Sequence, residues 1–221
     1  MSDLPLLQVG DDVLFTIAVR DIFATPVDAI VNPANTGLSH GGGLAEIISR
    51  MAGAALDNEC DAYIEQHGVL ETSSAMITTA GLLDFKAVIH AVGPIMGQGN
   101  ELEKLQLTIQ NVLAVAENAD TPISSVAFPM ISTGVYCVPK HICAQAFANA
   151  IKHYMHSEAD NKIKNIWLCV GLDDFELFAQ HFDTEVRASK QDSSNAGVAE
   201  FDIDEQALSD GDNSDIDDWF N

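Results

Sequence analysis

The stretch that decides the fold is DAIVNPANTGLSHGGGLAEIISRMAG, residues 28–53. It begins as an apolar run, reaches the polar residues Asn32, Asn35 and His40, passes three glycines and continues at helical spacing. This order is typical of a strand, a loop and an amphipathic helix. Glycine allows a ligand to approach the backbone closely, and the amides at a helix start carry partial positive charge. The stretch therefore predicts an anion-binding loop without a lysine, although a simple capped turn would use the same residue types.

Five further apolar runs alternate with helical patterns along the chain. Together with the first, the predicted strands cover residues 13–19, 28–33, 74–80, 87–93, 125–132 and 165–171. Apolar spacing predicts helices over 44–55, 102–116, 142–154 and 173–182. This alternation predicts a mixed or parallel sheet that is covered by helices on both sides. Ligands bind such sheets beyond the carboxyl ends of the strands.

The composition limits the classes of ligand. The 221 residues are 47% hydrophobic, as in a globular protein, and include 33 acidic but only 10 basic residues. Nucleic-acid backbones and anionic membranes require a basic footprint, so neither is an expected partner. An anionic ligand would have to be held by backbone amides and helix ends. The sequence shows neither a secretory leader nor a membrane-spanning run of about 20 apolar residues, and we expect a cytoplasmic protein.

The strand and helix pattern stops near Arg187, which predicts a folded domain over residues 1–184 and a disordered acidic tail over 185–221. Residues 188–221 contribute −9 to the formal net charge of −23. The tail ends on Trp219 and Phe220 behind three aspartates. It is either an inert solubilising segment or a short motif whose aromatic rings dock on a basic partner.

The four cysteines show no metal-binding pattern along the chain. Cys60, Cys137, Cys143 and Cys169 form no C-x-x-C pair, and none has a histidine at zinc-ligand spacing. We therefore predict buried free thiols, with Cys137 as the exception because it falls in a loop. No metal and no other cofactor is expected.

Two more segments fall at predicted strand ends. PMISTGVYCVPK, residues 129–140, offers backbone amides and hydroxyls around Gly134 to one anion. VRDIF, residues 19–23, places Asp21 where it could accept from an exocyclic amine or cap a helix. The chain lacks the G-K-[ST] of a Walker loop and the G-x-G-x-x-G of a dinucleotide fold. HGGG also resembles the oxyanion loop of some esterases, but we expect the G-x-S-x-G nucleophile elbow that those enzymes need to be absent.

At this point the segments DAIVNPAN, HGGG, VIHAVGP and AFPMISTGVYCVP, in this order, resemble the macrodomain family of ADP-ribose-binding modules. The resemblance covers about residues 6–182. It implies a three-layer α/β/α fold with a mixed, largely parallel central sheet of about six or seven strands. Ala45 stands where the MacroD-type hydrolases have a catalytic aspartate, and the chain is more similar to viral and archaeal members with HGGG.

The resemblance implies a role for each site residue. Asp21 would accept from the adenine amino group beside the amide of Ile22, and Leu172 would lie near the adenine. Asn35 would contact the distal ribose, with Asn32 as its supporting partner. Two loops would hold the distal ribose and the diphosphate, and their residues are Gly42, Gly43, Leu44, Ser132, Thr133, Gly134, Val135 and Tyr136.

The function implied is binding of ADP-ribose and of mono-ADP-ribosylated proteins, with hydrolysis of mono-ADP-ribose from Asp or Glu side chains. Because Ala45 cannot activate water, we expect Asn35 and the substrate diphosphate to position it, and His40 to assist near its ordinary pKa. Asn35 and His40 are thus the predicted catalytic residues, although His40 could instead pack the loop. The alternatives are a non-catalytic reader, a phosphatase acting on ADP-ribose 1″-phosphate, and a scaffold whose tail recruits a partner.

Overall fold

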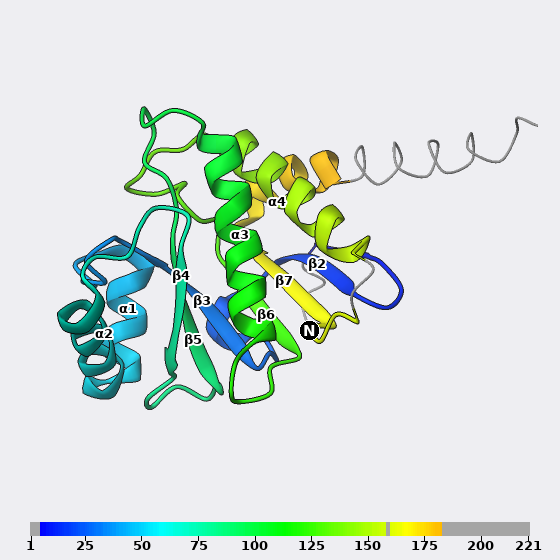
Figure 1. Ribbon diagram of the computed structural model, residues 1–221. Coiled ribbons are helices and arrows are strands. Elements are labelled where there is room, and N and C mark those ends of the chain that lie inside the picture. Colours follow the sequence, from blue (N-terminus) through cyan, green and yellow to red (C-terminus); the bar gives the residue numbers. More distant parts are fainter. Residues whose placement is uncertain (1–4, 158–159, 183–221) are drawn as a thin grey trace, which may run out of the picture.

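The computed structural model describes residues 5–157 and 160–182 as a seven-stranded mixed sheet between two layers of helices (Figure 1). The strands are β1 (Leu6–Val9), β2 (Leu14–Val19), β3 (Ala29–Ala34), β4 (Ala75–Thr79), β5 (Ala87–Val92), β6 (Ser125–Phe128) and β7 (Asn165–Val170). The helices are η1 (Ile22–Ala24), α1 (Gly43–Ala52), α2 (Ala54–His67), α3 (Glu101–Glu117) and α4 (Lys140–Met155), and residues 172–182 are also helical. The predicted fold class is confirmed.

The strand order is β1-β2-β7-β6-β3-β5-β4. The five inner strands, which are β2, β7, β6, β3 and β5, all pair in parallel. The edge strands β1 and β4 are antiparallel to their neighbours. The carboxyl ends of all five parallel strands therefore meet at one edge of the sheet, where ligands bind in folds of this kind.

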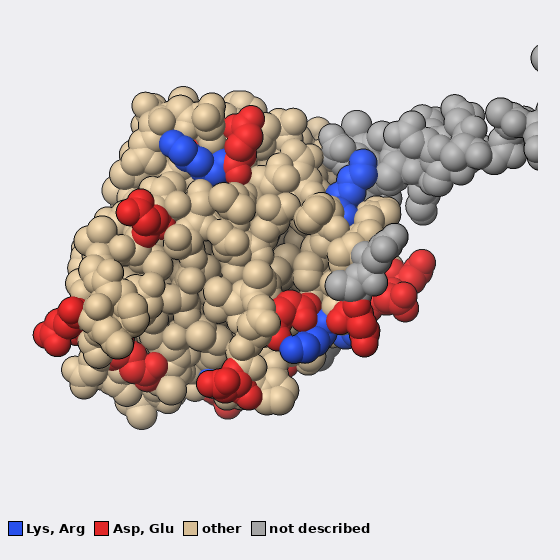
Figure 2. All heavy atoms as spheres, viewed as in Figure 1, with Lys and Arg blue, Asp and Glu red and all other residues tan. Residues whose placement is uncertain are grey.

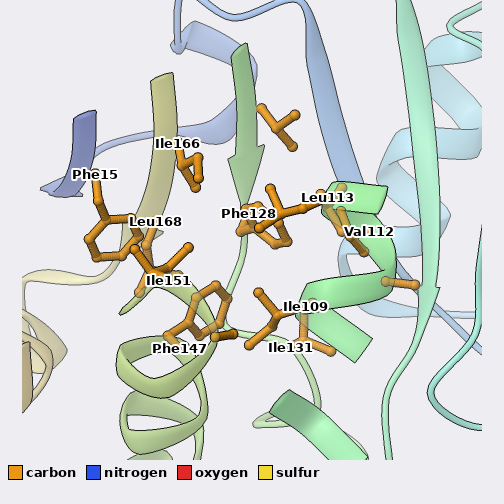
Figure 3. Close-up of a cluster of buried hydrophobic side chains, with 14 of the residues drawn as sticks. Phe15, Ile109, Val112, Leu113, Phe128, Ile131, Phe147, Ile151, Ile166 and Leu168 are labelled. Atoms are coloured by element: carbon orange, nitrogen blue, oxygen red, sulfur yellow. The ribbon is translucent and has the colours of Figure 1, made fainter. Parts of the chain in front are cut away.

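The two faces of the sheet bury two separate clusters. Helices α3 and α4 pack on one face through residues such as Ile109 and Phe147 (Figure 3). Helices α1 and α2 pack on the other face through Ile48 and Leu56. Since successive strand residues point to opposite faces, each inner strand contributes to both clusters.

Two elements differ from the sequence prediction. The helix predicted over 44–55 ends at Gly53, whose positive φ of 78° starts a second helix, α2. A side chain at Gly53 would lie 3.3 Å from Leu82, so the break is also a close contact. Strand β1 was not predicted because its residues are only partly buried and show little apolar contrast.

The predicted domain boundary at residue 184 and the acidic tail lie outside the described residues. Within the described part of the chain, no helix combines the length and the apolar character that crossing a membrane requires. On the face seen in Figure 2, the lysines and arginines are few and form no continuous patch. Cys60, Cys143 and Cys169 are buried free thiols and Cys137 is exposed, which confirms the prediction for the cysteines.

Candidate functional site

The predicted site residues gather at the carboxyl edge of the parallel strands. Residues 35–42, here called the first loop, connect β3 to α1, and residues 129–139, the second loop, connect β6 to α4. Asp21 follows β2, and Leu172 follows β7. Segments far apart in the sequence thus meet at one place because their strands run in the same direction.

Asn35 lies at the start of the first loop and is bound to Ser39. Its Nδ2 donates to the Ser39 carbonyl oxygen at 2.7 Å, and its Oδ1 accepts from the Ser39 amide at 3.0 Å. Both ends of the side-chain amide are therefore occupied without a ligand. Contact with a ribose requires that Asn35 exchange these bonds for new ones.

The three glycines of HGGG face open space. A Cβ atom placed on Gly41, Gly42 or Gly43 would meet no atom outside the adjoining residues within 4 Å. Only Gly43 has a positive φ, of 61°, and needs glycine for its conformation. No side chain caps the start of α1 at Gly42. The first loop therefore leaves room, on the protein side, for a group that approaches the helix amides.

The second loop presents backbone donors. The Cys137 amide donates to the Gly134 carbonyl oxygen at 3.0 Å, which closes a turn over residues 134–137. Within the described part of the chain, the amides of Gly134, Val135 and Tyr136 donate no hydrogen bond. Val135 is 88% exposed. Three successive unpaired amides offer donors of the kind that bind phosphate oxygens.

Gly93 lets the second loop lie against the end of β5. A Cβ on Gly93 would approach Oγ of Ser132 to 2.1 Å, so any side chain there would displace the loop. Ser132 is buried in a left-handed conformation with φ of 66°, and its hydroxyl has no hydrogen-bond partner within the described segments. The Tyr136 carbonyl oxygen accepts from the Met96 amide at 2.9 Å, which ties the loop to the segment after β5.

The far end of the edge carries the residues assigned to adenine. Asp21 caps η1, because its Oδ1 accepts from the Phe23 amide at 3.0 Å. The amide of Ile22 has no acceptor among the residues described. Leu172 is 62% exposed. Asp21 therefore fulfils the cap role, and its second carboxylate oxygen remains available to a ligand.

Asn32 lies behind the first loop and does not support Asn35 directly. Its side chain is fully buried, and Nδ2 lies 3.0 Å from Nδ1 of His90 and 3.4 Å from Nδ1 of His40. Within the described part of the chain, no hydrogen bond joins Asn32 to Asn35. The expected partnership is replaced by a buried cluster of two histidines around Asn32, which was not predicted.

His40 belongs to this buried cluster. Its side chain is 6% exposed, and burial lowers the pKa of the imidazole, opposed by the charges of Asp57 and Asp61. The expectation that His40 keeps its ordinary pKa is wrong, since the neutral ring is favoured inside the protein. Ala45 is also buried and Glu46 is exposed, so neither residue supplies a carboxylate inside the loop.

His90 and Cys60 are the residues that sequence reasoning missed. His90 lies in β5, where all six residues are buried, and a histidine inside such an apolar run was the available signal. Burial, followed by the nearby His40, lowers the pKa of His90 to about 3. Burial and the carboxylates of α2 raise the pKa of Cys60 to about 12.

Residues 37–41 read G-L-S-H-G, which has the G-x-S-x-G spacing of a nucleophile elbow. The expectation that this motif is absent was therefore wrong as a statement about sequence. The structural context of an elbow is missing, however, because Ser39 lies within the first loop and bonds to Asn35 instead of standing at a sharp strand-to-helix turn.

The sequence model of one family, described as "Macro domain", matches residues 31–147. The chain belongs to the macro domain family. This macro domain is 38% identical over 174 residues to a macro domain-containing protein of Listeria monocytogenes. That alignment covers 77% of this chain and 98% of the Listeria protein. It is 42% identical over 137 residues to a protein named O-acetyl-ADP-ribose deacetylase of Salmonella typhimurium, over 61% of this chain and 75% of that one.

Solved structures show the same fold as this macro domain. The Oceanobacillus iheyensis macrodomain with ADP superimposes with a TM-score of 0.75 at 28% identity, over 85% of this chain and 100% of that one. A variant of that macrodomain with ADPR gives a TM-score of 0.72 at 28% identity, over 83% of this chain and 100% of that one. A Trypanosoma brucei macrodomain with ADP-ribose gives 0.64 at 25% identity, over 75% of this chain and 68% of that one.

Proposed function

We propose that this macro domain binds ADP-ribose at the carboxyl edge of its sheet and hydrolyses mono-ADP-ribose esters of Asp and Glu side chains. The observation that carries the proposal is the set of unpaired amides at Gly134, Val135 and Tyr136, at the same edge as the open glycines of the first loop. A diphosphate would satisfy these donors without lysine, in keeping with the acidic chain.

The rest of ADP-ribose matches the remaining groups. The Asp21 carboxylate and the Ile22 amide provide one acceptor and one donor for an adenine edge. Asn35 provides both an acceptor and a donor for the hydroxyls of the distal ribose. The Oceanobacillus iheyensis structures with ADP and ADPR support this choice of ligand.

The reaction is a hydrolysis at the distal ribose. One water molecule is consumed, the bond between the ribose and the carboxylate oxygen breaks, and ADP-ribose and a free carboxylic acid are released. A carboxylate leaves readily, so the site has to orient water more than to protonate a leaving group. With Ala45 buried and His40 turned inward, Asn35 and the substrate diphosphate are the groups that place this water.

A small-molecule ester is the second candidate substrate. The relative at 42% identity is named O-acetyl-ADP-ribose deacetylase, and that name gives an acetyl ester of ADP-ribose as its substrate. In that reaction water attacks the acetyl carbonyl carbon, the bond between the acyl carbon and the oxygen breaks, and acetate and ADP-ribose are released. The two substrates therefore differ in the atom that the positioned water attacks.

Two measurements on the full chain test the proposal. Calorimetry with ADP-ribose tests binding, and loss of label from a protein modified on Glu or Asp tests hydrolysis. Asn35→Ala should weaken binding about tenfold, the size expected for losing a pair of hydrogen bonds. Asn149→Ala is the matched control, because Asn149 lies on α4 and bonds to Gln106 at 3.4 Å.

The outcomes separate the candidates. Release of the label by the unchanged chain, but not by Asn35→Ala, supports the hydrolase. Binding of ADP-ribose with no release from the modified protein or from O-acetyl-ADP-ribose leaves a reader. Absence of ADP-ribose binding contradicts the proposal as a whole.

A further inference from the structure

The register of the sheet places a line of polar side chains inside the layer of α1 and α2. Asn32 of β3 pairs with His90 of β5, and both point to the same face as Ile30 and Val88. On β4, Oγ1 of Thr78 lies 3.0 Å from Nε2 of His90. These residues are buried within an otherwise apolar cluster, where polar side chains need a hydrogen-bond partner or a bound ion.

Two more ligand-type atoms reach this line from outside the sheet. Sγ of Cys60, on α2, lies 3.7 Å from Nε2 of His90. One ligand atom each from His40, Cys60 and His90 all lie within 4.8 Å of one another. Tetrahedral zinc with one nitrogen and one sulfur ligand spaces those atoms about 3.5 Å apart, given bond lengths of about 2.0 and 2.3 Å. The pair of Cys60 and His90 is already close to this spacing, whereas the atoms of the whole group lie within 4.8 Å, so the site would contract around an ion.

One ring nitrogen of His40 is unpaired. Nε2 of His40 is buried and has no hydrogen-bond partner among the described residues, while the side chain is 6% exposed. Its nearest charged neighbour is Oδ1 of Asp57, at 3.7 Å. A buried imidazole nitrogen without a partner is costly, and a cation at this point would remove that cost.

Asn32 can orient both imidazoles for a metal. One terminal atom of its side-chain amide lies close to Nδ1 of both His90 and His40, at 3.0 and 3.4 Å. If the side-chain amide is turned over, so that its oxygen takes the place of Nδ2, it accepts from both Nδ1–H groups and leaves both Nε2 atoms as bare acceptors. Metal-binding histidines are usually held in this way by a group behind them.

We propose that His40, Cys60 and His90 bind one zinc ion. Asp57, whose carboxylate accepts from the Ser49 hydroxyl at 2.8 Å, would turn from Ser49 to become the fourth ligand. Two imidazoles, one thiolate and a carboxylate form a donor set that suits zinc better than magnesium or calcium. Asp57 lies three residues before Cys60 and on the same side of α2. The ion would tie the first loop, α2 and β5 together directly behind the residues assigned to ribose.

The local charge favours a dication. Asp57, Glu59 and Asp61 all lie on α2 near Cys60, and each adds to the rise in the pKa of its thiol after the larger effect of burial. The hydrogen bond between His90 and Thr78 is the competing arrangement, because Nε2–H donates there when no metal is bound. A zinc-ligating His40 would act as a structural residue and not as a base.

The full chain, freed of metal with a chelator and then given cobalt(II) or zinc(II), tests the site. Elemental analysis should find zinc equimolar with the chain after gel filtration. Cobalt(II) should give the absorption of a tetrahedral ion together with a thiolate-to-cobalt charge-transfer band. An unchanged chain that retains no zinc, or shows no thiolate band, overturns the proposal without any variant.

Variants then locate the ligands. Cys60→Ser should abolish the thiolate band, while Cys137→Ser, which removes the exposed thiol, should keep it. Asp57→Asn should weaken zinc by about tenfold or more. A thiolate band that persists in Cys60→Ser contradicts the assignment. Calorimetry with ADP-ribose on the metal-free chain reads the ligand site separately, so failure of either proposal leaves the other intact.

Discussion

The two faces of the sheet differ in what they bury. Under α3 and α4 apolar side chains dominate the cluster, with Phe128 and Phe147 in edge-to-face contact at 5.5 Å between ring centroids, and the buried Thr108 bonds within its own helix. Under α1 and α2 the apolar cluster is interrupted by Asn32, Thr78 and His90, which are all buried and come from three strands. One face is stabilised mainly by hydrocarbon packing, whereas the other also depends on a polar network between strands.

The two faces also lie differently relative to the two loops of the site. The polar line under α1 and α2 lies behind the first loop through His40, while the apolar face supports the second loop from below through Ile131 and Val138. A buried polar atom without a partner costs free energy. The line of polar residues is therefore stable only when its members form hydrogen bonds with one another or bind a ligand. Four measurements test whether the two faces differ in this way.

The largest effect is expected on the apolar face. Phe147→Ala should lower the free energy of unfolding by about 3–5 kcal/mol, because it leaves a cavity beside Phe128. Urea denaturation followed by fluorescence or circular dichroism measures it. The cobalt spectrum and the pH dependence of stability should be unchanged in this variant. A change in either would show that the two faces are not independent.

The next effect is a pH dependence of the polar face in the metal-free chain. His90 has a pKa near 3 when folded and about 6.5 when unfolded, so below pH 6.5 only the unfolded chain takes up the proton. Stability should therefore fall as pH drops from 6.5 toward 3, by up to about 1.4 kcal/mol per pH unit, and His40 adds in the same direction. Urea midpoints at pH 7 and pH 5 measure the slope.

His90→Gln should flatten that slope, since glutamine does not titrate. Phe147→Ala serves as the control of comparable burial and should keep the slope. Equal slopes in the unchanged chain and in His90→Gln would mean that His90 is not the buried base that the structure describes.

A matched pair of threonines gives an effect of intermediate size. Thr78→Val removes the acceptor of the His90 Nε2–H group and should cost about 1–3 kcal/mol in the metal-free chain. Thr108→Val, on the apolar face, removes only a bond to the carbonyl oxygen of Lys104 one helical turn earlier and should cost about 1 kcal/mol or less. Both are read from urea midpoints.

Zinc provides a further test of the two threonine variants. If the ion replaces the proton on Nε2 of His90, then Thr78→Val should cost less with zinc than without it, and Thr108→Val should cost the same in both. An equal Thr78→Val penalty in the two conditions speaks against an ion bound to His90.

The smallest effect on stability is expected at the end of the first loop, where α1 begins. Gly42→Ser adds a side chain where no atom outside the adjoining residues lies within 4 Å, at a helix start where serine is a favourable cap. The free energy of unfolding should change by about 0.5 kcal/mol or less. ADP-ribose affinity, measured by calorimetry, should fall because the side chain occupies the space before the helix amides. A large loss of stability would show that the chain itself requires this glycine.

Local patterns predicted most of the fold. The six apolar runs became β2 to β7, and helical spacing located α1, α3 and α4, because these elements bury continuous apolar surface. Helix α2 buries only Leu56 and Cys60 and lies beyond a helix break that depends on a single positive φ at Gly53. Periodicity in a sequence window does not report such a break.

The site was predictable only where it lies along one loop. Gly42, Gly43 and Gly134 follow strand ends, and their loops were located from sequence. The cluster of His40, Cys60 and His90 comes from three segments that only the strand register and the packing of α2 bring together. Spacing rules for zinc search short intervals, and no such interval contains these residues.

Asn35 has a further consequence for how the empty protein meets a ligand. Ser39, four residues away and covalently tethered, occupies both ends of its amide. A tethered partner acts as a competitor at an effective concentration in the millimolar range or above. The observed affinity of any ligand is then its intrinsic affinity reduced by the fraction of chains in which Asn35 is open. The first loop therefore discriminates between ligands. It favours molecules that can both donate to and accept from the Asn35 amide, as a pair of vicinal hydroxyls can, over molecules that replace only one of the two bonds to Ser39.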